Sequence, residues 1–198
     1  IVESLPIKQQ VFRDLAEATS STTVLATNTS SLLVSDIAQG IPHPERIVGL
    51  HFFNPPHQMP LVEIVRTNET SPAALATAFA LTQRLGKTAV IVKDCPGFLV
   101  NRLLSPYMNE AGWLLLEVDD PLEIDRAAVA FGMPMGPLEL TDLVGLEVGQ
   151  HVAANMHAAY GERMLPAPLW AALKEIAMTE PSAAKSLLIG KGAKKKLN

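Results

Sequence analysis

The sequence predicts an α/β region followed by an all-α region within 198 residues. Two observations carry this prediction. Short β-rich runs alternate with helical patterns up to about residue 93, and beyond that point the strand signals fade while long helical patterns take over. A hydrophobic content of 48% with 18% charged residues is typical of a chain that buries a core. We therefore expect two domains, residues 1–95 and 96–198.

The first region is expected to alternate helices and strands. Apolar residues at helical spacing predict three helices: residues 7–17, 33–39 and 72–85. Gly40 and Gly86 end the last two of them. β-rich runs predict four strands, of which we expect the last to be buried: residues 23–27, 46–53, 61–67 and 88–92. Three prolines exclude regular ladder structure between the second and third strands: Pro55, Pro56 and Pro60.

The second region is expected to be helical throughout. Its first helix is predicted to open within residues 94–97 and to run to about Glu117, with a kink at Pro106. Asp120 as a cap and Pro121 as the first helical residue predict the next helix, which Gly132 ends. Apolar spacing predicts three more helices: residues 137–144, 146–160 and 168–178.

Composition excludes several classes of function. A net charge of −4 argues against nucleic acid as a partner, because phosphate binders present a basic face. No apolar run approaches the ~18 residues of a membrane span. The single cysteine, Cys95, excludes an internal disulfide and fits a reducing compartment. We find no metal-ligand spacing, since His151 and His157 are six residues apart and do not share a helix face.

A polar segment, Asn28-Thr29-Ser30-Ser31, directly follows the first predicted strand. Side chains at the carboxyl end of a strand are where open α/β sheets bind ligands. The alternative is a helix cap or a Ser/Thr turn, which the segment taken in isolation favours.

His51 and Glu63 are the strongest catalytic candidates in the sequence. Glu63 interrupts the apolar run Leu61 to Val65, and alternation places it on the same face as two apolar side chains. A buried carboxylate without a partner is costly, so Glu63 either faces water or has a specific partner. His51 is the natural partner, because a carboxylate bound to one imidazole nitrogen orients the ring and leaves the other nitrogen to act as a base. The alternative for His51 is an ordinary buried histidine with a structural role.

Asn101 is a third candidate. It falls in the first turns of an apolar helix at the expected domain boundary. Ligand sites often lie at domain interfaces, so Asn101 could contact a ligand. The alternative is that Asn101 is an ordinary surface residue.

Taken together, these motifs resemble those of the L-3-hydroxyacyl-CoA dehydrogenase family. Within that family they are most similar to the dehydrogenase region of the multifunctional fatty-acid oxidation subunit. The resemblance covers roughly residues 1–175. The spacings agree as well: 21 residues from Ser30 to His51, 12 from His51 to Glu63 and 50 from His51 to Asn101. The motifs appear in the family's order: Asn28-Thr29-Ser30-Ser31, His51-Phe52-Phe53-Asn54-Pro55, Leu61-Val62-Glu63, Asp94-Cys95-Pro96-Gly97-Phe98-Leu99-Val100-Asn101-Arg102 and Pro134-Met135-Gly136-Pro137-Leu138-Glu139-Leu140.

The resemblance implies a reaction and a role for four side chains. L-3-Hydroxyacyl-CoA would be oxidised to 3-oxoacyl-CoA in fatty-acid β-oxidation, with hydride transfer to NAD. His51 would be the general base and Glu63 would orient it, while Ser30 and Asn101 would hold the oxygen and acyl-CoA of the substrate. The family's NAD site would be lined by five residues, of which Lys8 would also lie near the CoA: Glu3, Lys8, Asn28, Ser30 and Asn54.

The resemblance also implies an organisation. Residues 1–95 would be the second half of a Rossmann-type NAD-binding domain, whose glycine-rich first half we expect before Glu3, because the only G-x-G is Gly190-Lys191-Gly192 in a basic tail. Residues 96–198 would be the helical dimerisation domain, either in a homodimer or in a multifunctional β-oxidation subunit. We expect a cytoplasmic location, with the mitochondrial matrix or a peroxisome as the alternatives. Two other readings remain: a catalytically incompetent dimerisation or assembly module, and a 3-hydroxybutyryl-CoA dehydrogenase.

Overall fold

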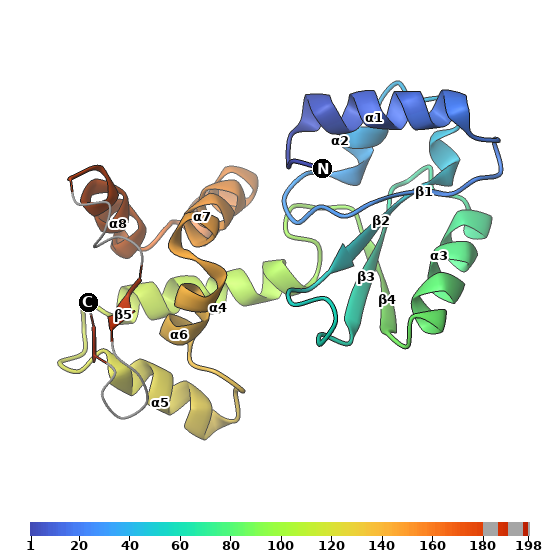
Figure 1. Ribbon diagram of the computed structural model, residues 1–198. Helices are drawn as coiled ribbons and strands as arrows, with labels where there is room; N and C mark the ends of the chain where they lie inside the picture. Colours follow the sequence, from blue (N-terminus) through green and yellow to red (C-terminus); the bar gives the residue numbers. More distant parts are fainter. Residues whose placement is uncertain (180–185, 190–195, 198) are drawn as a thin grey trace. The chain divides into compact units, whose positions relative to one another are not determined.

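The chain divides into two compact units, Ile1–Val100 and Asn101–Asn198. The computed structural model in Figure 1 describes residues 1–179, 186–189 and 196–197. The predicted G-x-G segment of the basic tail, Gly190-Lys191-Gly192, lies outside the described residues. No helix in the described residues is long and apolar enough to cross a membrane.

The first unit is built on a sheet with the strand order β1-β2-β3-β4. The four strands fall where the sequence predicts them: β1 (Leu25–Thr27), β2 (Ile47–Phe52), β3 (Leu61–Arg66) and β4 (Thr88–Lys93). β1 is parallel to β2 and β3 is parallel to β4, whereas β2 and β3 are antiparallel. The short connection between β2 and β3 explains this reversal, because parallel neighbours require a crossover of a dozen or more residues.

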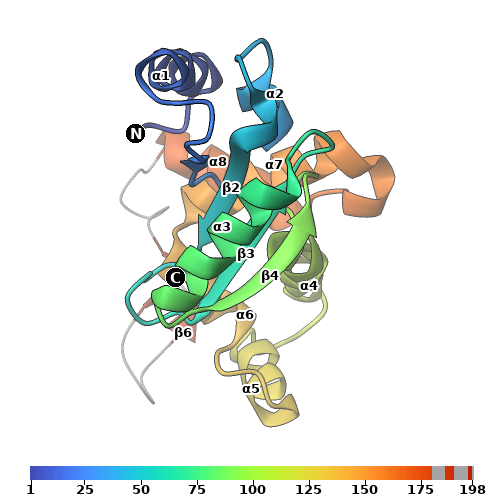
Figure 2. The ribbon, with the colours of Figure 1, turned by 90° about the vertical axis from the view of Figure 1, so that its right-hand side faces the viewer.

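Helices cover both faces of this sheet, as Figures 1 and 2 show. α1 (Leu5–Ala18) and α2 (Val34–Ala38) pack on one face, and α3 (Pro72–Arg84) packs on the other. Alternation along β2 decides which side chains meet which helices. Ile47 joins the core beneath α1 and α2, while Val48 and Leu50 join the core beneath α3. His51 therefore faces the α1 and α2 side.

Gly49 allows β2 to approach its neighbours closely on that same face. A Cβ atom at Gly49 would lie 2.8 Å from the Cβ of Val65 and 2.9 Å from Cγ2 of Val34. Real Cβ atoms essentially never make such contacts, so any larger residue would push β2, β3 and α2 apart. The glycine thus sets the packing of the strand that carries His51.

The expectation that residues 88–92 form a buried strand is wrong. Only Val92 of β4 is buried, its other positions are exposed or partly buried, and Ile91 is 46% exposed. The cause is its place in the sheet: within the described residues β4 pairs with β3 alone and is an edge strand.

The second unit is mainly helical, but the expectation that it is helical throughout is wrong, because two short strands pair near its end. Its helices are α4 (Val100–Leu114), α5 (Leu122–Phe131), α6 (Pro137–Val144), α7 (Leu146–Tyr160) and α8 (Pro168–Thr179). A two-stranded antiparallel pair follows them: β5 (Leu188–Ile189) and β6 (Lys196–Leu197). Gly132 takes a left-handed conformation and ends α5, as expected.

Two predicted helix starts are too early. α4 begins at Val100 rather than within residues 94–97, because Gly97 and Phe98 have φ angles of 75° and 46°, which no right-handed helix contains. α5 begins at Leu122, one residue after Pro121, and the Asp120 carboxylate accepts a hydrogen bond from the Leu122 amide at 3.1 Å.

Candidate active site

The antiparallel pairing of β2 and β3 places His51 directly opposite Glu63. Side chains at paired positions of neighbouring strands point to the same face of a sheet. The His51 Nδ1 and Glu63 Oε2 atoms lie 2.7 Å apart. His51 is 5% exposed and Glu63 is fully buried. The partnership predicted from the sequence is present, and it arises from strand register.

The second carboxylate oxygen of Glu63 is held by backbone amides. Oε1 accepts hydrogen bonds from the Leu99 amide at 3.0 Å and the Val100 amide at 2.8 Å. The left-handed conformations of Gly97 and Phe98 turn the chain so that these amides reach the carboxylate. Glu63 therefore meets the requirement that a buried carboxylate be hydrogen-bonded on both oxygens.

The His51 ring contacts two aromatic rings. Its centroid is 4.6 Å from that of Phe53 and 5.5 Å from that of Phe98, the latter in an edge-on arrangement. An ionised carboxylate can only accept hydrogen bonds, so Nδ1 carries the hydrogen of the Glu63 contact. The described residues provide no hydrogen-bond partner for Nε2, which is therefore the nitrogen able to accept a proton from a bound molecule.

Asp94 anchors the segment that reaches Glu63. Its amide donates to the Arg66 carbonyl at 3.0 Å, at the end of β3. Its carboxylate accepts from the Val34 amide at 3.0 Å and the Ser35 amide at 2.8 Å, at the start of α2. The segment that clamps Glu63 is thus tied at its origin to both the sheet and α2.

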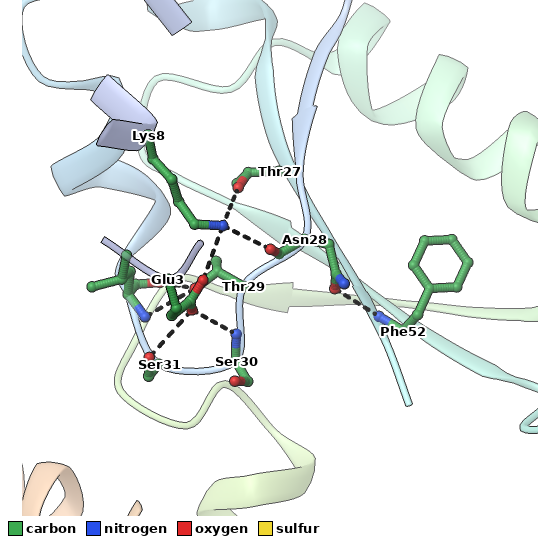
Figure 3. Close-up of polar contacts among 9 residues, drawn as sticks. Glu3, Lys8, Thr27, Asn28, Thr29, Ser30, Ser31 and Phe52 are labelled. Carbon is green, nitrogen blue, oxygen red and sulfur yellow. Dashed lines mark hydrogen bonds and ion pairs between the residues drawn. The ribbon is translucent and has the colours of Figure 1, made fainter. Parts of the chain in front are cut away.

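A second polar cluster surrounds the segment that follows β1, as Figure 3 shows. Oε1 of Glu3 accepts hydrogen bonds from the Thr29 hydroxyl, from the Ser30 amide at 3.3 Å and from the Ser31 hydroxyl at 3.2 Å. Thr29 in turn accepts from the Leu32 amide at 3.0 Å. Glu3 therefore fixes the backbone that presents Ser30.

Lys8 joins this cluster to the first strand. Its Nζ lies 3.0 Å from Oε2 of Glu3 and donates to the Asn28 carbonyl at 2.9 Å. The Asn28 side chain accepts from the Phe52 amide at 3.3 Å, one residue beyond His51. The segment that follows β1 and the strand that carries His51 are thus linked by a side-chain hydrogen bond in addition to the pairing of β1 with β2.

The pKa of Glu3 is lowered below its usual value of 4.5. Burial is the largest influence and by itself raises this pKa, but the hydrogen bonds from Thr29 and Lys8, the Lys8 charge and the Ser30 amide together outweigh it. Glu3 is therefore ionised at neutral pH and serves as the anionic centre of the cluster.

We expect Glu3→Gln to destabilise the fold at neutral pH, because it removes the ion pair with Lys8. The loss of stability should be only about 1 kcal/mol, because solvent weakens a partly exposed ion pair. A carboxylate with a lowered pKa in the folded state contributes stability above its unfolded pKa and loses it as the pH falls through the folded pKa. The difference between wild type and variant should therefore shrink below pH 4.5. Urea unfolding at neutral and acid pH checks this, with exposed Glu17→Gln as control. A difference that stays constant in acid would contradict the proposed role of the charge.

The structure places the remaining predicted residues as follows. Glu3, Lys8, Asn28 and Ser30 share one cluster, with Asn28 and Ser30 exposed. Asn54 lies exposed, two residues beyond β2, and Asn101 is the first residue of the second unit. No group of three or more His, Cys, Asp or Glu residues suited to a metal ion occurs in the described part of the chain.

Sequence reasoning assigned no role to three groups that hold this site. Thr29 carries no sequence signal beyond its place in a polar motif, although its hydroxyl bridges Glu3 and the Leu32 amide. The Leu99 and Val100 amides were not foreseen as the clamp on Glu63. The Pro96-Gly97 pair was the available signal, because it indicates a turn that can aim consecutive amides at one acceptor.

Two family models match the chain in sequence order. The model described as the NAD binding domain of 3-hydroxyacyl-CoA dehydrogenase matches residues 1–95. The model described as the C-terminal domain of 3-hydroxyacyl-CoA dehydrogenase matches residues 97–183.

Curated and solved proteins agree with these matches. The chain is 42% identical to the fatty acid oxidation complex subunit alpha of Shewanella amazonensis, over 98% of this chain and 28% of that subunit. It resembles the crystal structure of FadB2 of M. tuberculosis with a TM-score of 0.84 and 38% identity, covering 89% of this chain and 64% of that one. The 3-hydroxybutyryl-CoA dehydrogenase of Escherichia coli K12 gives a TM-score of 0.84 and 42% identity, covering 88% and 38%. The chain thus spans about a quarter of the length of the curated relative.

Proposed function

Because the chain belongs to the 3-hydroxyacyl-CoA dehydrogenase family, we propose that its protein oxidises L-3-hydroxyacyl-CoA to 3-oxoacyl-CoA with NAD, in fatty-acid β-oxidation. The observation that carries the proposal is the buried pair of His51 and Glu63, joined at 2.7 Å. Alcohol oxidation needs a base for the hydroxyl proton, and an oriented imidazole with one free nitrogen supplies it.

His51 would accept the hydroxyl proton at Nε2. The resulting imidazolium carries a positive charge next to the Glu63 carboxylate, which is itself fixed by two backbone amides. The charge that develops on the ring is therefore stabilised by a group already in position. Bound NAD would supply the hydride acceptor for the substrate carbon.

The cluster after β1 fits the cofactor. The carboxyl end of a strand is where open α/β sheets bind dinucleotides. Ser30 and Asn28 are exposed there. Their backbone is fixed by hydrogen bonds, from the Ser30 amide to Glu3 and from Lys8 to the Asn28 carbonyl. We assign Glu3, Lys8, Asn28, Ser30 and Asn54 to the NAD site, and Lys8 also to the substrate side near the CoA.

Ser30 and Asn101 complete the proposed site. Both offer hydrogen-bonding groups for the substrate oxygen and acyl-CoA. Asn101 directly follows the Val100 amide that binds Glu63, so a short stretch of chain links the proposed substrate contact to the orienting carboxylate. The homodimer expected through residues 96–198 and the place within a multifunctional subunit stay predictions.

The full-length protein is expected to consume NADH when acetoacetyl-CoA is supplied, which is the reverse of the proposed oxidation. The loss of NADH absorbance measures this reaction. The control omits acetoacetyl-CoA and should show no loss. A protein that forms a stable dimer in sedimentation but neither binds NADH nor consumes it would instead be an assembly module.

A second candidate is the 3-hydroxybutyryl-CoA dehydrogenase activity. It is favoured by the likeness to the Escherichia coli enzyme of that name, at 42% identity. The chemistry at His51 would be the same, so the two candidates differ in the acyl chain that they accept. Comparing kcat/KM for acetoacetyl-CoA with kcat/KM for longer 3-oxoacyl-CoA substrates in the same assay separates them.

A further inference from the structure

We propose that Lys87 is a positioning residue for this active site, because its ammonium group fixes the loop that carries Asn54. The inference rests on the proposed function, since Asn54 matters here as a residue of the NAD site. No motif in the sequence draws attention to Lys87.

Lys87 stands at the turn between α3 and β4. It follows Gly86, whose φ angle of 70° allows the sharp change of direction, and its side chain is half-buried. Its Nζ donates hydrogen bonds to the Pro56 carbonyl at 2.6 Å and to the Met59 carbonyl at 2.8 Å. Among the described residues, no carboxylate pairs with this ammonium group, so the two carbonyls are its described partners.

The loop that Lys87 contacts, residues 53–60, connects β2, which carries His51, to β3, which carries Glu63. It begins directly after β2, three residues before Pro56, and ends where β3 starts. Its own backbone hydrogen bonds come from the Gln58 and Met59 amides, which both donate to the Pro55 carbonyl at 3.0 Å. The Thr88 amide secures the far end by donating to the Pro60 carbonyl at 2.8 Å.

Lys87 adds the contacts that tie the middle of this loop to the sheet. Hydrogen bonds from a charged donor are stronger than those between neutral groups. When the two Lys87 hydrogen bonds are removed, water can bind the exposed carbonyls of Pro56 and Met59, so the loss of folding stability is small. The position of Asn54 would nevertheless become less well defined, and misplacement of a binding group weakens ligand binding steeply.

The inference predicts a selective effect on cofactor binding. In the full-length protein, we expect Lys87→Met to raise KM for NADH about tenfold and to leave kcat within about twofold of wild type. Lys87→Arg keeps the charge and should restore KM to within about twofold of wild type. Lys93→Met, at the other end of β4 and exposed, is the matched control and should change neither constant.

A double-mutant cycle with Asn54→Ala identifies the route of the effect. If Lys87 acts through Asn54, Lys87→Met raises KM for NADH far less in the Asn54→Ala background than in wild type. An unchanged KM in Lys87→Met, or an equal increase in both backgrounds, overturns the role of Lys87. Titration of each variant with NADH measures the same quantity without turnover. A wild-type protein that binds NADH but does not consume it with acetoacetyl-CoA overturns the proposed function, while these titrations still decide the role of Lys87.

Discussion

Replacement of His51 with glutamine is expected to lower kcat by about 10²- to 10⁴-fold, the range for loss of a general base. The amide of glutamine can accept a hydrogen bond from a substrate hydroxyl, but it cannot take up the proton. Because the ring is held by Glu63 at 2.7 Å and lies against Phe53 and Phe98, glutamine replaces a fixed base with a flexible neutral group. Steady-state kinetics with NADH and acetoacetyl-CoA measures the effect.

His57→Gln is the matched control for this variant. His57 is an exposed histidine in the loop that follows the same strand, and among the described residues its side chain hydrogen-bonds to Gln58. Its replacement should leave kcat within about twofold of wild type, since surface substitutions rarely disturb a site. If His51→Gln kept near-wild-type turnover, His51 would not be the base.

Glu63→Gln is expected to have the second largest effect, a decrease in kcat of about 10²-fold or more. The substitution removes the negative charge that stabilises the imidazolium ion. It can also turn an NH₂ group toward the Leu99 and Val100 amides, which need an acceptor. We therefore expect a loss of stability of about 1 to 3 kcal/mol in addition to the loss of activity.

Two measurements separate these effects of Glu63→Gln. Urea unfolding gives the stability, and kcat is then measured on protein shown to be folded. Glu69 is exposed and lies just beyond the same strand, so Glu69→Gln is the control for the change of charge. A folded Glu63→Gln variant with wild-type kcat would show that the carboxylate has a structural role alone.

The partnership of His51 and Glu63 could be predicted because a carboxylate in an apolar strand leaves few physical options. Alternation placed Glu63 among apolar side chains, where it needs a partner, and the histidine of the preceding strand was available. The four strands of the first unit were equally clear, because β-rich runs have a strong local signal, whereas the two-residue strands β5 and β6 are too short to give one.

Other features depend on contacts far apart in the chain and carried no local signal. Thr29 and Lys87 gain their roles only when loops meet, as their partners are Glu3, Pro56 and Met59. The exposure of β4 follows from its place in the sheet rather than from its apolar composition. The late start of α4 reflects Phe98, whose left-handed conformation is rare for a bulky residue and is not signalled by its type.

Glu63 is expected to act on the reaction through the His51 ring. The most direct measurement is kcat for the His51→Gln and Glu63→Gln double variant compared with His51→Gln alone. We predict equal values, because a carboxylate has nothing to orient once the imidazole is gone. A double variant that is slower than His51→Gln by the full factor measured for Glu63→Gln would show that Glu63 acts independently of His51.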